Sequence, residues 1–386
     1  MERNAPIKRI FLFGMLILLC VTSVTIVSCN TEDAKGSIGL EYEITEDGAA
    51  CGIIGIGSCT DVEIHIPKEI DGYPVCYIGE AAFSKKFNIT SVTIPDTVQA
   101  ICSDAFKDCA SLQRISIGSG LKLVLENAFD NCVSLQEVHI KDLASWCDIR
   151  FFSNPLTQAH NLYVKGKLVT DLKIPYGVKS ISSSAFEGCT SITSLELPKT
   201  LESLEHCAFR NCSSLQGKLN IPKSLTYMGE MVFKGTEFNG VYITDLSAWC
   251  DIYLGNDGAN PLLYAHNLYL NDKLVTNLVI PDNITTIKEG AFSGCTSITA
   301  VSISNSVCTV GSSAFGNCKN LKSIVIPKSV ERMGAHVFYG CEDIKIFCQA
   351  SAQPKGWDSR WNVSYADASD FWGVRTRYFP VTWGDS

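Results

Sequence analysis

The chain has 386 residues, of which 46% are hydrophobic and 19% are charged, and its formal net charge is −8 at pH 7. This length exceeds what one compact core usually fills, and the apolar composition argues against wholesale disorder. The excess of 40 acidic over 32 basic residues opposes non-specific binding to nucleic acid, and it opposes adsorption of the folded chain to an anionic membrane surface.

The first 28 residues have the features of a secretion signal. Basic residues precede an uncharged apolar run, Ile10–Ile26, which ends shortly before Ser28 and Cys29. A cysteine after a small residue resembles the bacterial lipoprotein signal. This resemblance implies that residues 1–28 are removed and that Cys29 is acylated, which would hold the exported chain in the cell envelope, at its surface. The alternative is a signal anchor that stays in the membrane. Residues 29–39 form a polar tether, and no later stretch reaches the roughly 18–20 apolar residues of a second span.

A phenylalanine recurs every 23 or 24 residues within each of three groups. In seven of these repeats a cysteine follows three positions later, whereas Lys86 and Thr236 take that place in the other two. The phenylalanines are Phe83, Phe106, Phe129, Phe186, Phe209, Phe233, Phe292, Phe315 and Phe338. The cysteines, called the cysteine ladder below, are Cys109, Cys132, Cys189, Cys212, Cys295, Cys318 and Cys341.

Each repeat also contains one short apolar segment. Ile115 and Ile117 alternate with polar residues, which is the pattern of a strand with one buried face. Proline often closes the segment, as Pro95 does, because proline cannot donate to a strand ladder. One such unit buries too little to fold alone, so neighbouring units must stack. The sequence therefore predicts a mainly β solenoid of short parallel strands with capped ends.

A longer unit occurs twice among the regular repeats. Asp142–Ile149 matches Asp245–Ile252, and His160–Tyr163 matches His266–Tyr269. We expect each copy to contain an extended segment of paired strands, with a tight hairpin turn at Lys165-Gly166 in the first copy.

The ends differ from the repeats, as the ends of a solenoid must. Residues 40–80 are predicted to form an N-terminal cap and first turn, residues 81–348 the solenoid, and residues 349–386 an aromatic C-terminal cap. The motif Ala-Phe-x-x-Cys-x-x-Leu, followed by a strand and Ile-Pro, resembles the BspA-like leucine-rich repeat family. The resemblance extends over about residues 40–386. Members of this family are typically secreted or surface proteins of bacteria and some protists that are associated with adhesion to proteins, and the resemblance implies the same for this chain.

The cysteines show none of the short paired spacings that are typical of zinc sites. Because the ladder cysteines recur once per turn, we interpret them as small buried side chains. Cys51 and Cys59 in the cap could form a disulfide, and the sequence leaves this open. Cys147 beside Asp148 could suggest a nucleophile, but its duplication with the surrounding apolar residues favours a structural unit. We expect no enzyme activity, no metal site and no cofactor.

Outward side chains of the stacked strands are the remaining candidates for function. Arg114, Glu137, His139 and Glu196 are predicted to point outward and to contribute to ligand binding, although such residues can also be merely solvated. Repeat proteins use such faces to bind partners. The sequence therefore favours a surface-displayed binding or adhesion module for proteins or glycans. The alternative is a structural or accessory envelope lipoprotein without a host ligand.

Overall fold

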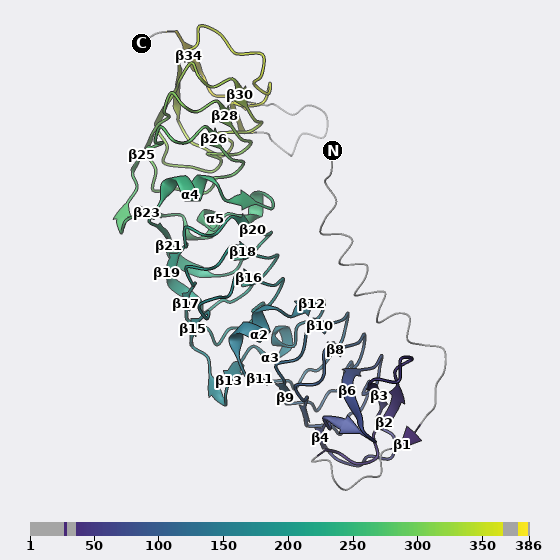
Figure 1. The fold of residues 1–386 in the computed structure, drawn as a ribbon. Helices are drawn as coiled ribbons and strands as arrows, with labels where there is room; N and C mark the ends of the chain where they lie inside the picture. Colours follow the sequence, from purple (N-terminus) through teal and green to yellow (C-terminus); the bar gives the residue numbers. More distant parts are fainter. Residues whose placement is uncertain (1–26, 29–35, 366–376, 385–386) are drawn as a thin grey trace. The chain divides into compact units, whose positions relative to one another are not determined.

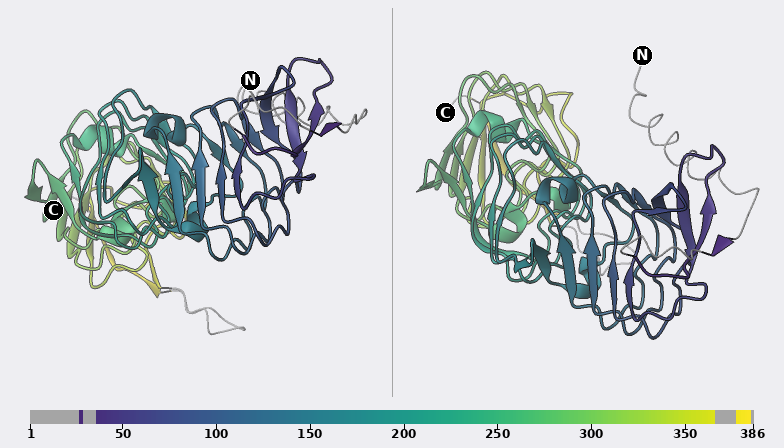
Figure 2. Two further views of the ribbon diagram at one scale, coloured as in Figure 1. Left: turned by 90° about the horizontal axis from the view of Figure 1, so that it is seen from below. Right: turned by 60° about the horizontal axis from the view of Figure 1, so that its bottom comes forward.

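The computed structural model describes residues 27–28, 36–365 and 377–384, and the chain forms two compact units, residues 1–167 and 168–386. Each unit is a coil of short strands that stack turn upon turn (Figures 1 and 2). The predicted fold class is confirmed, because the structure is mainly β, its solenoid strands are parallel and its helices are few and short. The predicted acylation residue Cys29 and the signal segment lie outside the described residues, apart from Val27 and Ser28.

Two sheets form the walls of the first unit. One sheet has the order β14-β13-β11-β9-β7-β4, and the other has the order β1-β2-β3-β6-β8-β10-β12, with antiparallel pairing where β1, β2 and β3 begin it. The elements are β1 (Val27–Ser28), β2 (Glu41–Ile44), β3 (Cys51–Gly55), β4 (Glu63–His65), β5 (Glu69–Ile70), β6 (Tyr73–Ile78), β7 (Ser91–Thr93), β8 (Ala100–Ile101), β9 (Arg114–Ile117), β10 (Leu123–Val124), β11 (Glu137–Ile140), α2 (Leu143–Cys147), β12 (Arg150–Phe151), α3 (Leu156–Ala159), β13 (Leu162–Val164) and β14 (Lys167–Leu168), which lies at the boundary between the units.

The second unit repeats this plan with several smaller sheets. On one wall the orders are β15-β17, β19-β21-β23-β24 and β25-β27-β29-β31-β34, and on the other they are β16-β18-β20-β22 and β26-β28-β30. The elements are β15 (Asp171–Lys173), β16 (Ser180–Ile181), β17 (Ser194–Glu196), β18 (Ser203–Leu204), β19 (Gln216–Asn220), β20 (Tyr227–Met228), β21 (Glu237–Ile243), α4 (Leu246–Cys250), β22 (Tyr253–Leu254), η1 (Asp257–Ala259), α5 (Leu262–Ala265), β23 (Leu268–Leu270), β24 (Lys273–Leu274), β25 (Asn277–Val279), β26 (Thr286–Ile287), β27 (Ala300–Ser302), β28 (Thr309–Val310), β29 (Ser323–Ile326), β30 (Arg332–Met333), β31 (Lys345–Cys348), β32 (Val363–Tyr365), β33 (Arg377–Tyr378) and β34 (Val381–Trp383).

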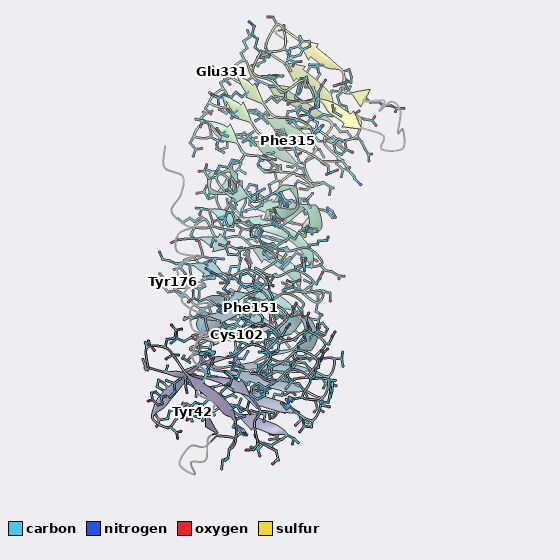
Figure 3. All side chains as sticks on the ribbon, turned by 90° about the vertical axis from the view of Figure 1, so that its right-hand side faces the viewer. Tyr42, Cys102, Phe151, Tyr176, Phe315 and Glu331 are labelled. Carbon is cyan, nitrogen blue, oxygen red and sulfur yellow. The ribbon has the colours of Figure 1, made fainter. Side chains whose placement is uncertain are left out.

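The recurring phenylalanines form the core of the turns. All nine are buried, and within each group neighbouring rings stack face to face with centroids 5.2–6.0 Å apart. Figure 3 places Phe315 inside the second unit, in contrast to Tyr176, which is 85% exposed. Burial and ring stacking therefore both stabilise the contact between consecutive turns.

The turn that carries each phenylalanine has an unusual backbone. In all nine repeats the residues two positions before and two positions after the phenylalanine have a positive φ. Glycine and asparagine tolerate this conformation at little cost, but Met231 and His336 also adopt it. The amides of the turn point to the next turn, as the Phe83 amide does when it donates to the carbonyl oxygen of Ala105 at 2.8 Å. The phenylalanine edge is therefore a second hydrogen-bonded ladder beside the strands.

The cysteine ladder has the packing role that its spacing predicts. All seven cysteines are buried, and no disulfide joins them within the described part of the chain. In five turns the thiol donates to the phenylalanine carbonyl of the preceding turn, at 3.0–3.2 Å. The structure also answers the question about the cap. Cys51 and Cys59 are not bonded to each other, and the Cys51 thiol instead donates to the carbonyl oxygen of Tyr73 at 3.5 Å.

The long units contain short helices that the sequence interpretation missed. Residues 143–147 form α2, and Asp142 caps it by accepting from the Ser145 amide at 2.8 Å. The expected paired strands are present in this copy as β13 and β14, but the helix before them was not predicted. The expected hairpin is confirmed, since β13 and β14 are joined by Lys165 and Gly166, both with positive φ.

The second copy of the long unit terminates one stack and starts the next. Its Asn260 is 0% exposed and donates to the carbonyl oxygens of Gly290 and Ala291 at 2.6 and 3.0 Å. The indole of Trp249 also donates to the Ala291 oxygen at 3.0 Å. At the end of the last stack, Trp361 packs on Phe338, and its carbonyl oxygen accepts from the Val337 amide at 2.9 Å. In the second unit, these main-chain groups at the ends of the repeat stacks are thus hydrogen-bonded.

Candidate functional site

The strand face of the first unit consists of the outward side chains of β4, β7, β9, β11 and β13. Parallel pairing in register brings the last outward residue of each strand into one line, with neighbours about 4.8 Å apart. We call the first four members of this line the polar row, and they are His65, Thr93, Ser116 and His139. Tyr163 continues the line on β13.

Three of the four predicted binding residues lie together at one end of this face. Glu137 accepts from Arg114 Nε at 2.7 Å and contacts His139 Nε2 at 2.9 Å. The hydrogen bond from His139, and then that from Arg114, hold the pKa of the Glu137 carboxyl below its ordinary value. The His139 ring stacks on Tyr163 with centroids 4.5 Å apart. Because the Arg114 and Glu137 side chains are 56% and 30% exposed, this ion pair contributes little to stability and can exchange partners.

Glu196, the fourth predicted residue, does not belong to this cluster. It lies on β17 in the second unit, in register with Lys173 on β15. Glu196 Oε2 and Lys173 Nζ are 3.3 Å apart, and both side chains are largely exposed. The prediction thus combined residues of two units, because one repeat position recurs in both.

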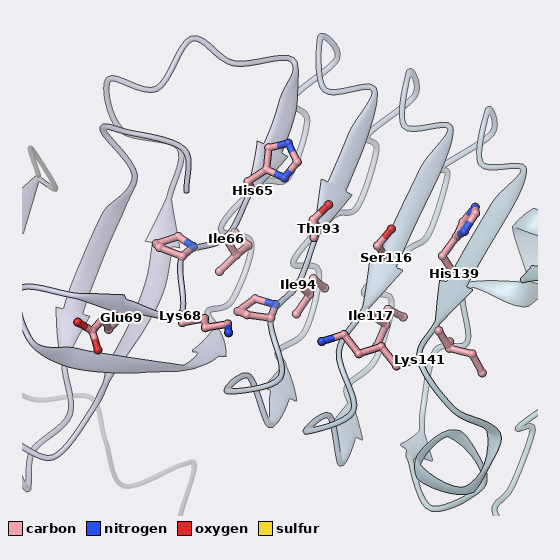
Figure 4. Close-up of a pocket in the computed structure, with 13 residues that line it drawn as sticks. His65, Ile66, Lys68, Glu69, Thr93, Ile94, Ser116, Ile117, His139 and Lys141 are labelled. Atoms are coloured by element: carbon pink, nitrogen blue, oxygen red, sulfur yellow. The ribbon is translucent and has the colours of Figure 1, made fainter. Parts of the chain in front are cut away.

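A groove of about 580 Å³ runs along the polar row (Figure 4). The polar row forms one wall, and the residues that follow the strands form the other, including Pro67, Lys68, Pro95 and Lys141. Figure 4 shows the ends of Lys68 and Lys141 on the same side of the groove, below the row. The groove therefore combines hydrogen-bonding side chains, proline rings and two cations.

Sequence reasoning missed most of the residues that line this groove. Only His139 was among the predicted binding residues. The signal for the others was present, since Thr93 and Ser116 precede His139 by two repeats and one repeat of 23 residues. Lys68 and Lys141 each follow closely on the end of a strand, where the repeat pattern predicts only a turn.

The comparisons with known proteins place this architecture in a family. The family model described as BspA type Leucine rich repeat region (6 copies) matches residues 76–168, 160–247 and 265–352. The chain belongs to this family of BspA-type leucine-rich repeats.

Two solved structures resemble the BspA-type chain. A leucine rich cell surface protein from Faecalibacterium prausnitzii A2-165 is 21% identical, with 87% of this chain and 84% of that chain covered and a TM-score of 0.44. A leucine-rich repeat protein from Bacteroides ovatus ATCC 8483 is also 21% identical, with 87% and 90% covered and a TM-score of 0.45. No curated protein matched the chain in sequence.

The second copy of the long BspA-type unit presents different outward chemistry. Tyr242 and Tyr269 occupy the places of His139 and Tyr163, and their rings stack with centroids 4.3 Å apart. Lys218 Nζ lies 4.6 Å from the centroid of the Tyr242 ring. The first copy therefore presents a carboxylate beside a His–Tyr stack, and the second presents a lysine over a Tyr–Tyr stack.

The cysteines of the two long units are poorly suited to nucleophilic chemistry. Cys147 and Cys250 are each 1% exposed, and burial raises the pKa of each thiol to about 12. A cysteine nucleophile needs access and a lowered pKa, so these thiols fit a packing role instead. Among the residues that the structure describes, no group of His, Cys, Asp and Glu could hold a metal ion. In the same residues, no helix has the length and apolar character to cross a membrane.

Proposed function

We propose that this BspA-type chain is a surface-displayed binding or adhesion module that recognises a protein or glycan through its strand face. The observation that carries the proposal is the groove of the first unit, where several polar side chains face solvent along one wall of stacked strands. Extended faces of this kind are the surfaces that solenoid proteins use for recognition. Lipid anchoring through Cys29 would display the units at the cell envelope, and this remains part of the proposal.

A non-catalytic role is also part of the proposal. Catalysis needs a reactive group together with its activating partners in one place. The buried, high-pKa thiols of Cys147 and Cys250 do not meet that need. A structural or accessory envelope role without a ligand is the second candidate, and the experiment below separates it from binding.

The test uses two matched variants of the first unit. One variant changes Arg114, Glu137 and His139 to alanine. The control changes three side chains near the short strands of the opposite sheet, where Lys122 and Asp148 form an ion pair of 2.9 Å; these control positions are Gln99, Lys122 and Asp148. Both variants remove three polar side chains, and among these are the two partners of an Arg–Glu pair in the first variant and of a Lys–Asp pair in the control.

Both variants and the parent chain are screened against purified extracellular matrix proteins and a glycan array. We expect a ligand that binds the parent and the control, and that binds the Arg114, Glu137 and His139 variant at least about 10-fold more weakly. Loss of binding in the control alone would move the site to the other sheet. No bound ligand on either array would favour the structural role.

A further inference from the structure

The groove of the first unit has unused hydrogen-bonding capacity along its length. The imidazole of His65, the hydroxyls of Thr93 and Ser116, and the ammonium of Lys68 have no hydrogen-bond or ion-pair partner among the described residues. Four such groups along one groove can all contact a single extended ligand. Because neighbouring strands are about 4.8 Å apart, a ligand that spans the polar row crosses three such intervals.

The charged side chains of the groove favour a ligand that bears anions. Lys141 pairs with Asp96, but Asp96 also accepts from the amide and the hydroxyl of Ser119 at 2.8 and 3.2 Å. The Lys141 and Asp96 side chains are 58% and 41% exposed, so Lys141 can turn to a ligand at small cost while Asp96 keeps other partners. Of the described residues that line the groove, Glu69 is the one acid, and Figure 4 shows it at the end beyond Lys68.

The geometry of the sheet disfavours a peptide as the occupant. Peptides commonly bind sheets by adding a strand at an edge, but β7 and β9 are interior strands whose main-chain groups pair on both sides. At the edge strand β4, both main-chain groups of His65 already bond to Ser37. The isoleucines of the groove also offer little exposed surface to the side chains of a peptide. These isoleucines are at most 6% exposed, and they are Ile66, Ile94, Ile117 and Ile140.

We propose that this groove binds an acidic glycan, a linear oligosaccharide whose carboxylates contact Lys68 and Lys141 and whose hydroxyls contact the polar row. The short polar side chains of the row match a ligand that carries hydroxyls at close intervals along its length. The partly exposed Pro95 ring gives a small apolar surface for the sugar C–H groups. This inference rests on the proposed function, because it assigns a ligand class to the same strand face.

The test uses the full chain and a galacturonic acid oligosaccharide as the probe. Isothermal titration compares the acid form with its methyl ester, which has the same sugars without carboxylate charge. We expect the ester to bind at least about 10-fold more weakly, and we expect a similar loss for the acid form on the Lys68→Gln/Lys141→Gln variant. Replacement of both lysines by arginine should retain binding. The Lys322→Gln/Lys345→Gln variant of the second unit is the matched charge control and should bind like the parent.

Each outcome separates this inference from the proposed function. No binding of the acid form overturns the glycan assignment, while the Arg114, Glu137 and His139 comparison still tests the strand face. Binding that is unchanged in the Lys68→Gln/Lys141→Gln variant places the glycan elsewhere and overturns the groove. Binding of polyglutamate but not of the oligosaccharide, with the same dependence on the two lysines, would indicate an acidic protein ligand. This outcome contradicts the glycan assignment and supports the strand face as the binding surface. Both lysines are exposed, so circular dichroism of the variants should match that of the parent.

Discussion

Replacing Cys212 by alanine or serine tests how the cysteine ladder joins consecutive turns. Cys212 is 0% exposed, and its thiol donates to the carbonyl oxygen of Phe186, one turn earlier, at 3.0 Å. The Cys189 amide also donates to this oxygen, at 3.1 Å, so loss of the thiol does not leave the carbonyl without a partner. Cys212→Ala removes a buried sulfur and leaves a small cavity, and we expect a loss of about 2 kcal/mol in the free energy of unfolding.

Cys212→Ser should cost less, about 1 kcal/mol, because a hydroxyl at this position has an acceptor within its own turn. Thr236, which takes the place of a ladder cysteine, forms such a hydrogen bond: its hydroxyl donates at 2.7 Å to the carbonyl oxygen of Phe233, three residues earlier. The corresponding oxygen for a serine at position 212 belongs to Phe209.

The assay combines urea unfolding, followed by circular dichroism, with hydrogen exchange of peptides that cover residues 205–215. Local exchange matters because a chain with two units need not unfold in one transition. The control is Cys308→Ser at an exposed cysteine, which should change stability by less than about 0.5 kcal/mol. A serine variant less stable than the alanine variant would show that the hydroxyl finds no acceptor, and the reasoning from Thr236 would fail.

Three further changes test the end of the solenoid, the thiols and the anchor. Trp361→Ala should cost about 3 kcal/mol locally, because the buried indole packs on Phe338, and limited proteolysis should then cleave the C-terminal residues sooner than in the parent. The free energy of unfolding should fall as the pH rises from about 9 to about 12, because burial raises the pKa of Cys132 from 9.0 to about 12 and the thiol of the unfolded chain ionises first. A shallower pH dependence in Cys132→Ala would support this explanation, and an unchanged one would contradict it. Cys29→Ser should abolish acylation, so incorporation of labelled fatty acid into this variant would disprove the lipoprotein interpretation.

The core could be predicted from the sequence because the same spacing recurs in many repeats, and each recurrence supports the assignment of the others. Phe209 and Cys212 each recur at the same place in neighbouring turns, and identical spacing puts them at one structural position. The alternation of Ile115 and Ile117 in another repeat then determines which face of the strand is buried. These are packing features, which repeat with the backbone.

Features that depend on one contact were not predictable in this way. Asp142 could have belonged to a strand or capped a helix, and only the position of the Ser145 amide decides it. Asn260 gives no sequence signal that its amide meets two carbonyl oxygens about 30 residues later. The groove likewise depends on how Lys68 turns relative to the polar row, which no period determines.

The two long units show how one scaffold presents different chemistry through coupled outward positions. Glu137 in the first copy corresponds to Gly240 in the second, where a Cβ atom would lie only 2.6 Å from the Tyr269 ring. The absence of a side chain at Gly240 thus leaves room for Tyr269 to stack on Tyr242. In the first copy a carboxylate occupies that place and bonds to His139, which replaces the first tyrosine of the pair. The outward side chains of neighbouring strands thus contact one another in both copies. We therefore expect the ligand preference of this face to change by sets of neighbouring residues rather than by single substitutions.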